Sequence, residues 1–101
     1  MIQINGTITL GGPLDDTIRD ALVAMVRASR AEDGCLDYAF AQDLTDPGTL
    51  VLFERWRDAE ALAAHGRSAH MQTFRAVMAG NPPAGSALRR YETDDGAPLG
   101  G

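Results

Sequence analysis

The chain has 101 residues, of which 45% are hydrophobic and 23% charged, and its 14 acidic and 9 basic residues give a net charge of −5. This length fits one domain with a single core, and the apolar fraction is too high for a disordered chain. All nine basic residues are arginines, with no cluster longer than Arg89-Arg90, so the sequence carries no nucleic-acid-binding footprint. No window approaches the roughly 20 apolar residues of a membrane span.

The first residues and the single cysteine suggest the compartment in which the protein resides. The first residues have neither the basic nor the apolar region of a secretory signal, so we expect a cytoplasmic location. Cys35 is the only cysteine and permits no internal disulfide, which agrees with a reducing compartment. Because a chain of this size buries only about 60–70% of its surface, we also expect a homodimer.

The first third of the chain predicts a strand followed by a helix. Apolar and polar side chains alternate over residues 1–10, as in a half-buried strand, and the Gly-Gly-Pro stop at 11–13 ends it. From Leu14 to Ser29 the apolar residues recur at the spacing of one helix face. Acidic residues lie near the start of this helix and Arg27 and Arg30 near its end, which suits the helix dipole.

The middle of the chain predicts a β-hairpin. Residues 35–43 alternate again, with Leu36, Tyr38 and Phe40 on one face, and Asp46-Pro47-Gly48 forms a tight turn. Residues 50–57 form the returning strand, with Leu50, Leu52, Glu54 and Trp56 on one face. Both faces of this strand begin apolar, so we expect the sheet to be covered on both sides.

The last third predicts a split helix and a final strand. Asp58 caps a short helix over 59–65, Gly66 breaks it, and Ser68 caps a second helix over 69–79. Residues 86–92 form a weakly alternating strand, and residues 93–101 form a mobile tail.

This order predicts a ferredoxin-like α+β sandwich, β-α-β-β-α-β, with a single domain over 1–92 and a flexible tail over 93–101. The helices cover one face of the antiparallel sheet. A second copy would cover the other face, leaving a cavity between helices and sheet for a small apolar ligand.

His65 and His70 are the only histidines, and they lie five residues apart across Gly66. Metal-binding pairs on one helix face prefer a separation of four, so the spacing does not indicate a metal site. On a continuous helix the two rings would point about 140° apart, and they share a pocket only if the helix breaks between them. Otherwise His65 is a residue favoured by the helix dipole and His70 a partly buried side chain.

Other candidates lie on the strands. Glu54 shares a face with Trp56 and must reach solvent or find a partner, for which Arg27 and Arg75 are candidates. Cys35 has no basic neighbour in sequence, so we expect it to be a packed residue. An aromatic and methionine set either lines a cavity or fills it as core, and it comprises Tyr38, Phe40, Phe53, Met71 and Phe74.

Three motifs together resemble a known family. They are Glu32-Asp33-Gly34-Cys35-Leu36-Asp37-Tyr38, Phe53-Glu54-Arg55-Trp56, and His65 followed by His70-Met71. In this order and spacing they resemble the antibiotic biosynthesis monooxygenase domain, near its quinol monooxygenase branch. The resemblance implies a dimeric ferredoxin-like α/β barrel without metal, flavin or other cofactor. It also implies oxidation of a quinol, anthrone or similar aromatic polyketide with O₂.

The resemblance also suggests roles for residues. It implies that His65, Trp56 and His70 are catalytic, with His65 as the base or anion-stabilising donor and no metal ligand among them. Asn5, Tyr38, Phe53, Met71 and Phe74 would then bind the substrate.

Departures from the family and its branches leave one alternative open. Haem degradation is disfavoured, because His65 and Arg75 stand where haem-degrading members carry tryptophan and histidine. The alternative is a non-oxidative dimeric binding protein or an isomerase that uses the same pocket. An isomerase of a phosphorylated sugar would need a basic anion pocket, for which Arg67 and Arg75 are candidates.

Overall fold

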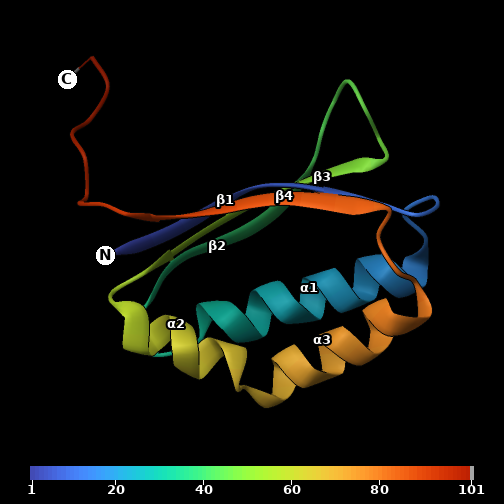
Figure 1. The fold of residues 1–101 in the computed structure, drawn as a ribbon, viewed down its shortest axis with the longest axis horizontal. Helices are drawn as coiled ribbons and strands as arrows, with labels where there is room; N and C mark the ends of the chain where they lie inside the picture. The colour runs from blue at the N-terminus through green and yellow to red at the C-terminus, as the bar shows by residue number, and fades with distance from the viewer. Residues whose placement is uncertain (101) are drawn as a thin grey trace.

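The computed structural model describes residues 1–100 and shows one antiparallel sheet with three helices on one of its faces (Figure 1). The elements are β1 Ile2–Thr9, α1 Asp16–Arg30, β2 Cys35–Gln42, β3 Thr49–Trp56, α2 Ala59–Gly66, α3 Ala69–Gly80 and β4 Gly85–Glu92. The strand order is β2-β3-β1-β4. The predicted ferredoxin-like α+β fold with a split second helix is confirmed. No helix within residues 1–100 is both long and apolar enough to cross a membrane.

Side chains cap the start of all three helices. The Asp15 carboxylate accepts the N–H of Ile18 at 2.9 Å, and Asp58 and Ser68 begin α2 and α3 as predicted. Each cap satisfies a backbone N–H that has no partner within its helix. The turn between α2 and α3 spans only Arg67 and Ser68. The helical axis therefore changes direction between His65 and His70.

The core lies between the helices and the inner face of the sheet. Strand register places Ile2 beside Trp56 and Tyr38 beside Glu54 on this face, and all four are less than 9% exposed. Leu36 was predicted on the same face as Tyr38, but it is 46% exposed. A register shift between Cys35 and Asp37 interrupts the alternation, because a β-bulge changes which way the next side chain points.

The outer face of the sheet carries no helix (Figure 1). Val51, Phe53 and Tyr91 lie on it and are 36–43% exposed. The chain's own helices therefore cover one face of the sheet, and cover of the other face by a second copy stays a prediction. Apolar side chains on an open sheet face leave a surface that a partner can bury.

The first residues after β4 contact the N-terminal end of β1 and the neighbouring β3. The N–H of Thr93 donates to the Met1 carbonyl at 2.9 Å, and Arg55 forms an ion pair with Asp95 at 3.4 Å. Gly101, in the tail predicted to be mobile, lies outside the described residues.

Gly6 is required by the close approach of β1 and β4. Its φ is +149°, and a Cβ added there would lie 1.9 Å from the Ala87 carbonyl oxygen. We expect Gly6→Ala to destabilise the protein by roughly 3 kcal/mol, because backbone atoms have to move. Gly80→Ala is the matched control, since its added Cβ meets nothing within 4 Å. Equal chemical-denaturation midpoints for the two variants would contradict this account of Gly6.

Candidate functional site

Three helix-end residues converge on one carboxylate oxygen. Glu32 follows α1, His65 lies in the last turn of α2, and His70 lies in the first turn of α3. The His65 Nδ1 lies 2.7 Å from Oε1 of Glu32, and Nε2 of His70 hydrogen bonds to the same oxygen. The two imidazole centroids are 5.8 Å apart. The break between α2 and α3 brings the two rings together, as the sequence reasoning required.

This arrangement assigns the free nitrogen of His65. An ionised carboxylate only accepts hydrogen bonds, so both rings donate an N–H to Glu32. In the neutral imidazole, His65 therefore carries its proton on Nδ1, and its Nε2 is left as an acceptor. That Nε2 is buried and has no hydrogen-bond partner among residues 1–100. A buried nitrogen with an unused lone pair is a position for accepting a proton.

Aromatic rings enclose His65. The Trp56 side chain is fully buried, and its centroid lies 4.6 Å from that of His65 with a 36° tilt. The Tyr38 ring lies 5.4 Å away on centroids. His65 itself is only 2% exposed. The imidazole therefore lies in a dry, aromatic environment, in which electrostatic interactions are strengthened.

Glu54 finds its partner in Trp56. The indole N–H donates to Oε1 of Glu54 at 2.8 Å. The predicted arginine partners are wrong: Arg75 donates to the Gly66 carbonyl at 3.2 Å, and Arg27 lines a pocket between α1 and β2. Burial raises the pKa of Glu54, and the indole bond and the nearby His65 oppose that rise. The indole N–H is thus hydrogen bonded to Glu54, and Trp56 contacts His65 through its aromatic ring.

Cys35 and Tyr38 stay protonated at neutral pH. Burial, followed by the Glu32 charge, raises the pKa of Cys35 to about 11. Cys35 is therefore a thiol, in line with its interpretation as a packed residue, because the thiolate is the reactive form. Burial, followed by the Glu54 charge, raises the pKa of Tyr38 above its ordinary value. Tyr38 thus presents a neutral phenol beside His65.

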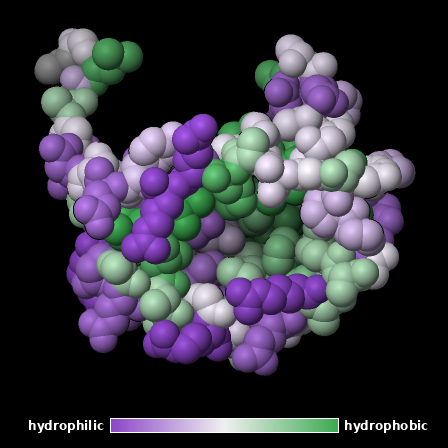
Figure 2. Space-filling view, viewed as in Figure 1, coloured by the Kyte–Doolittle hydropathy of each residue, from purple (hydrophilic) through white to green (hydrophobic). Residues whose placement is uncertain are grey.

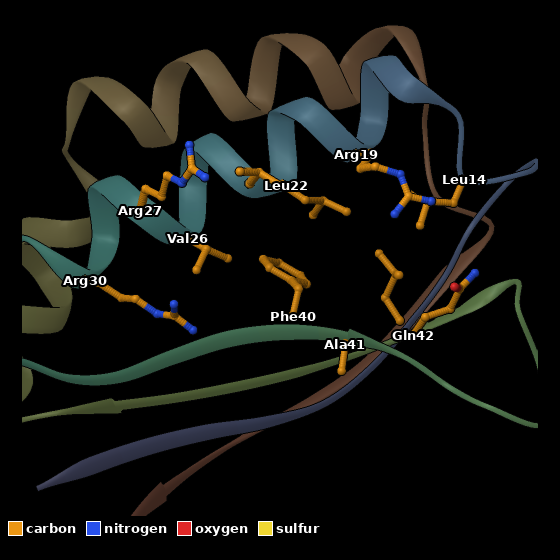
Figure 3. A pocket seen from close by; sticks show the side chains of 11 residues that line it. Leu14, Arg19, Leu22, Val26, Arg27, Arg30, Phe40, Ala41 and Gln42 are labelled. Atoms are coloured by element: carbon orange, nitrogen blue, oxygen red, sulfur yellow. The ribbon is translucent and has the colours of Figure 1, made fainter.

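A pocket of about 350 Å³ opens between α1 and β2. Figure 2 shows an apolar hollow between helices and sheet, with hydrophilic side chains at its edge. Phe40 projects from β2 toward α1 into this space (Figure 3). The full lining is Leu14, Arg19, Leu22, Val23, Val26, Arg27, Arg30, Phe40, Ala41, Gln42 and Leu50. Its volume lies at the lower end of the range for small-molecule sites, about 300–1,000 Å³.

Comparison with known proteins identifies the family. The family model described as "Antibiotic biosynthesis monooxygenase" matches residues 1–77. The chain belongs to the antibiotic biosynthesis monooxygenase family.

Sequence relatives and solved structures agree with this membership. "Putative monooxygenase Rv0793" from Mycobacterium tuberculosis is 46% identical over 61 residues, which is 60% of this chain and 59% of that protein. The match to "Putative monooxygenase YcnE" of Bacillus subtilis covers 54% of that protein. The chain thus matches little more than half the length of each of these two relatives. The Rv0793 structure superposes with a TM-score of 0.82 at 30% identity, covering 96% of this chain and 98% of that one. PA3566 from Pseudomonas aeruginosa superposes with a TM-score of 0.81 at 28% identity, covering 91% and 92%.

Within this family member, the residues predicted for the site fall into two groups. His65, His70, Trp56 and Tyr38 lie together in one cluster. Met71 and Phe74 pack against the same core. Asn5 and Phe53 face each other across β1 and β3 on the outer face of the sheet. The structure therefore does not bring them to the histidines, and the Asn5 amide oxygen accepts from Gln3 instead.

Sequence reasoning missed the role of Glu32 in joining the histidines. Glu32 is 33 residues from His65 and 38 from His70, so no local spacing indicates the contact. Glu32, His65 and His70 also offer three donor atoms that lie within 4.8 Å of one another, a set that suits a divalent transition metal. Both ring nitrogens that face Glu32 are already hydrogen bonded to it. A metal ion would have to replace these two hydrogen bonds.

Glu54→Gln tests the buried carboxylate. Because burial raises the pKa of Glu54 above its ordinary 4.5, the folded protein holds this proton more tightly than the unfolded chain does. This proton binding contributes to the stability of the folded protein below pH 4.5. The contribution is lost as the pH rises through the pKa of Glu54 in the folded state. A glutamine still accepts the Trp56 N–H but carries no charge. We therefore expect the stability of Glu54→Gln relative to wild type to increase from acidic to neutral pH.

Denaturant unfolding at several pH values measures this difference. Glu60→Gln is the control, since Glu60 is an exposed residue of α2. A stability difference between Glu54→Gln and wild type that does not change with pH would refute the assignment.

Proposed function

We propose that this chain is a cofactor-independent monooxygenase that oxidises a quinol, anthrone or similar aromatic polyketide with O₂. Its membership of the antibiotic biosynthesis monooxygenase family supports the reaction class. The observation that carries the proposal is the unpartnered Nε2 of His65, buried among aromatic rings. A proton acceptor in an apolar site is what activation of a weakly acidic aromatic substrate requires.

In the proposed reaction the substrate supplies the electrons. His65 accepts a proton from the anthrone carbon or quinol hydroxyl at Nε2, and the Glu32 carboxylate stabilises the positive imidazolium. The substrate anion then gives one electron to O₂, and the resulting radical and superoxide combine to a peroxide. The imidazolium returns its proton to this peroxide. For an anthrone, loss of water converts the CH₂ group to a carbonyl, so one O₂ yields one product carbonyl and one water.

Aromatic side chains link the pocket to this base. Phe40 lines the pocket, its ring centroid lies 5.9 Å from that of Tyr38, and Tyr38 lies 5.4 Å from His65. A substrate in the pocket is thus separated from Nε2 by these two rings. We propose that Phe40 and Tyr38 move aside when the substrate enters, which keeps His65 dry until then.

Turnover by two variants tests the base. His65→Ala removes the acceptor, and Glu32→Gln lets the side-chain amide donate to Nδ1, which shifts the His65 proton to Nε2. We expect each to lower oxygen uptake by about 10²-fold or more, the usual contribution of a general base. The measurement is O₂ consumption by metal-stripped protein with reduced naphthoquinones, benzoquinols and anthrones, corrected for autoxidation in buffer.

The matched control for Glu32→Gln is Glu60→Gln, which makes the same change on the exposed side of α2. It should keep wild-type uptake. Full turnover by a folded His65→Ala variant would refute the role of His65. Uptake that disappears on metal removal and returns with added metal would refute cofactor independence. Tight ligand binding with no uptake above buffer would favour the alternative of a non-oxidative binding protein or isomerase.

We further propose that two copies pair through the outer faces of their sheets. This pairing would bury Val51, Phe53 and Tyr91, which the chain itself leaves exposed. We expect Phe53→Asp to shift the protein from dimer to monomer in sedimentation velocity, because a charge in an apolar interface is costly. Leu44→Asp is the control, since Leu44 is fully exposed in the β2–β3 turn. A wild-type monomer, or a Phe53→Asp dimer as stable as wild type, would overturn the pairing.

A further inference from the structure

All charged residues that line the pocket between α1 and β2 are positive. We propose that this pocket selects an organic anion, namely a flat apolar ring system that carries a carboxylate. This inference rests on the proposed function only in taking that anion to be the substrate. The binding preference itself follows from the lining.

Three arginines and no acidic residue line the pocket: Arg19, Arg27 and Arg30. In the whole chain acidic residues outnumber basic ones by 14 to 9. One third of the basic residues therefore surround one small cavity in an acidic protein. A cleft lined by one sign of charge concentrates ligands of the opposite sign.

These arginines are available to a ligand. None of the ion pairs found within residues 1–100 involves any of them. The Nε of Arg30 donates to the Tyr38 carbonyl at 2.8 Å, which holds the guanidinium at the pocket edge. Its two terminal nitrogens are left for a ligand, and a guanidinium fork matches a carboxylate in geometry.

Stability of α1 does not explain the position of Arg19. Arg27 and Arg30 lie in the last turn of α1, where a cation favours the helix dipole. Arg19 lies near the opposite end of the same helix, where a cation is unfavourable. A ligand anion in the pocket would give Arg19 a partner that the chain does not supply.

The rest of the lining fits an aromatic ring. Leu22 and Val26 of α1 and Phe40 of β2 form an apolar centre between Arg30 at one end and Arg19 at the other (Figure 3). Arg19 extends toward Gln42 at the far end (Figure 3). A planar ring stacks on Phe40 while its acidic group reaches an arginine at the rim. A neutral ring of the same size fills the same centre but leaves the guanidinium groups without a partner.

Matched probes measure this preference. The ligands are 2-naphthoate and the uncharged 2-naphthamide, compared by isothermal titration calorimetry at low and high salt. We expect naphthoate to bind about three- to tenfold more tightly than naphthamide, and the difference to shrink at high salt, because the arginines are solvent-exposed. In ¹H–¹⁵N spectra, shifts on binding should centre on Leu22, Val26 and Phe40.

Two variants assign the charge effect. Arg30→Gln and Arg19→Gln should each weaken naphthoate binding and leave naphthamide binding unchanged. The control is Arg89→Gln, which removes an exposed charge on β4, on the outer face of the sheet, and should change neither. Thermal unfolding checks that each variant folds.

Three outcomes would overturn the inference: equal affinity for the two probes, an equal loss in Arg89→Gln, or shifts centred away from the pocket. Naphthoate is neither a quinol nor an anthrone, so its binding is measured without turnover. Anion-selective binding with no oxygen uptake from any substrate would refute the proposed function alone. Uptake from neutral quinols without anion selectivity would refute this inference alone.

Discussion

Oxygen Oε1 of Glu32 holds the ends of three helices together. It accepts from His65 at the end of α2 and from His70 at the start of α3, while Glu32 itself follows α1. One carboxylate thus fixes the angle at which the split helix meets α1. It also fixes the tautomer of His65, because its Nδ1 proton must face the carboxylate. The same contact therefore positions the helices and creates the proposed base.

Two carboxylates, one buried and one half-buried, flank the aromatic cluster in different ways. Glu32 satisfies two histidine N–H groups, whereas Glu54 receives one indole N–H and lies deeper, at 6% exposure. Burial raises the pKa of Glu54, so charge is less readily held there. The pair thus gives His65 a carboxylate on its Nδ1 side and a tryptophan ring supported by the second carboxylate. Different environments for two similar groups are a common way of dividing roles in a site.

The fold follows from the sequence because its signals are local. The caps Asp58 and Ser68, the alternation in β1 and β3, and the turn at Asp46-Pro47-Gly48 each depend on a few neighbouring residues. The errors arise where the strand geometry is irregular or where the sequence offers several polar partners for one group. A bulge exposes Leu36, and the partner of Glu54 is Trp56, two residues away on the same strand, where charge pairing suggested arginine.

The site was partly predictable for the same reason. His65, His70 and Trp56 stand out as rare residue types, and the break after Gly66 allows the two rings to meet. Glu32 does not stand out, because only the packing of α1 against α3 brings it to them. Only the family resemblance assigns Asn5 and Phe53 to the substrate. Strand alternation instead places both on the outer face, opposite the histidines.

The separation of the pocket from His65 suits the chemistry proposed for this small fold. The pocket is open to solvent through its arginine rim, so an anionic or polar ligand can enter without losing all its hydration at once. His65 lies behind Tyr38 and Phe40, where water is excluded and a proton taken from the ligand is not lost to solvent. A solvent-exposed imidazole would exchange its proton with water, and a fully closed pocket would admit no ligand. In the proposed reaction, the two aromatic rings between pocket and base are therefore the element whose movement has to accompany each turnover.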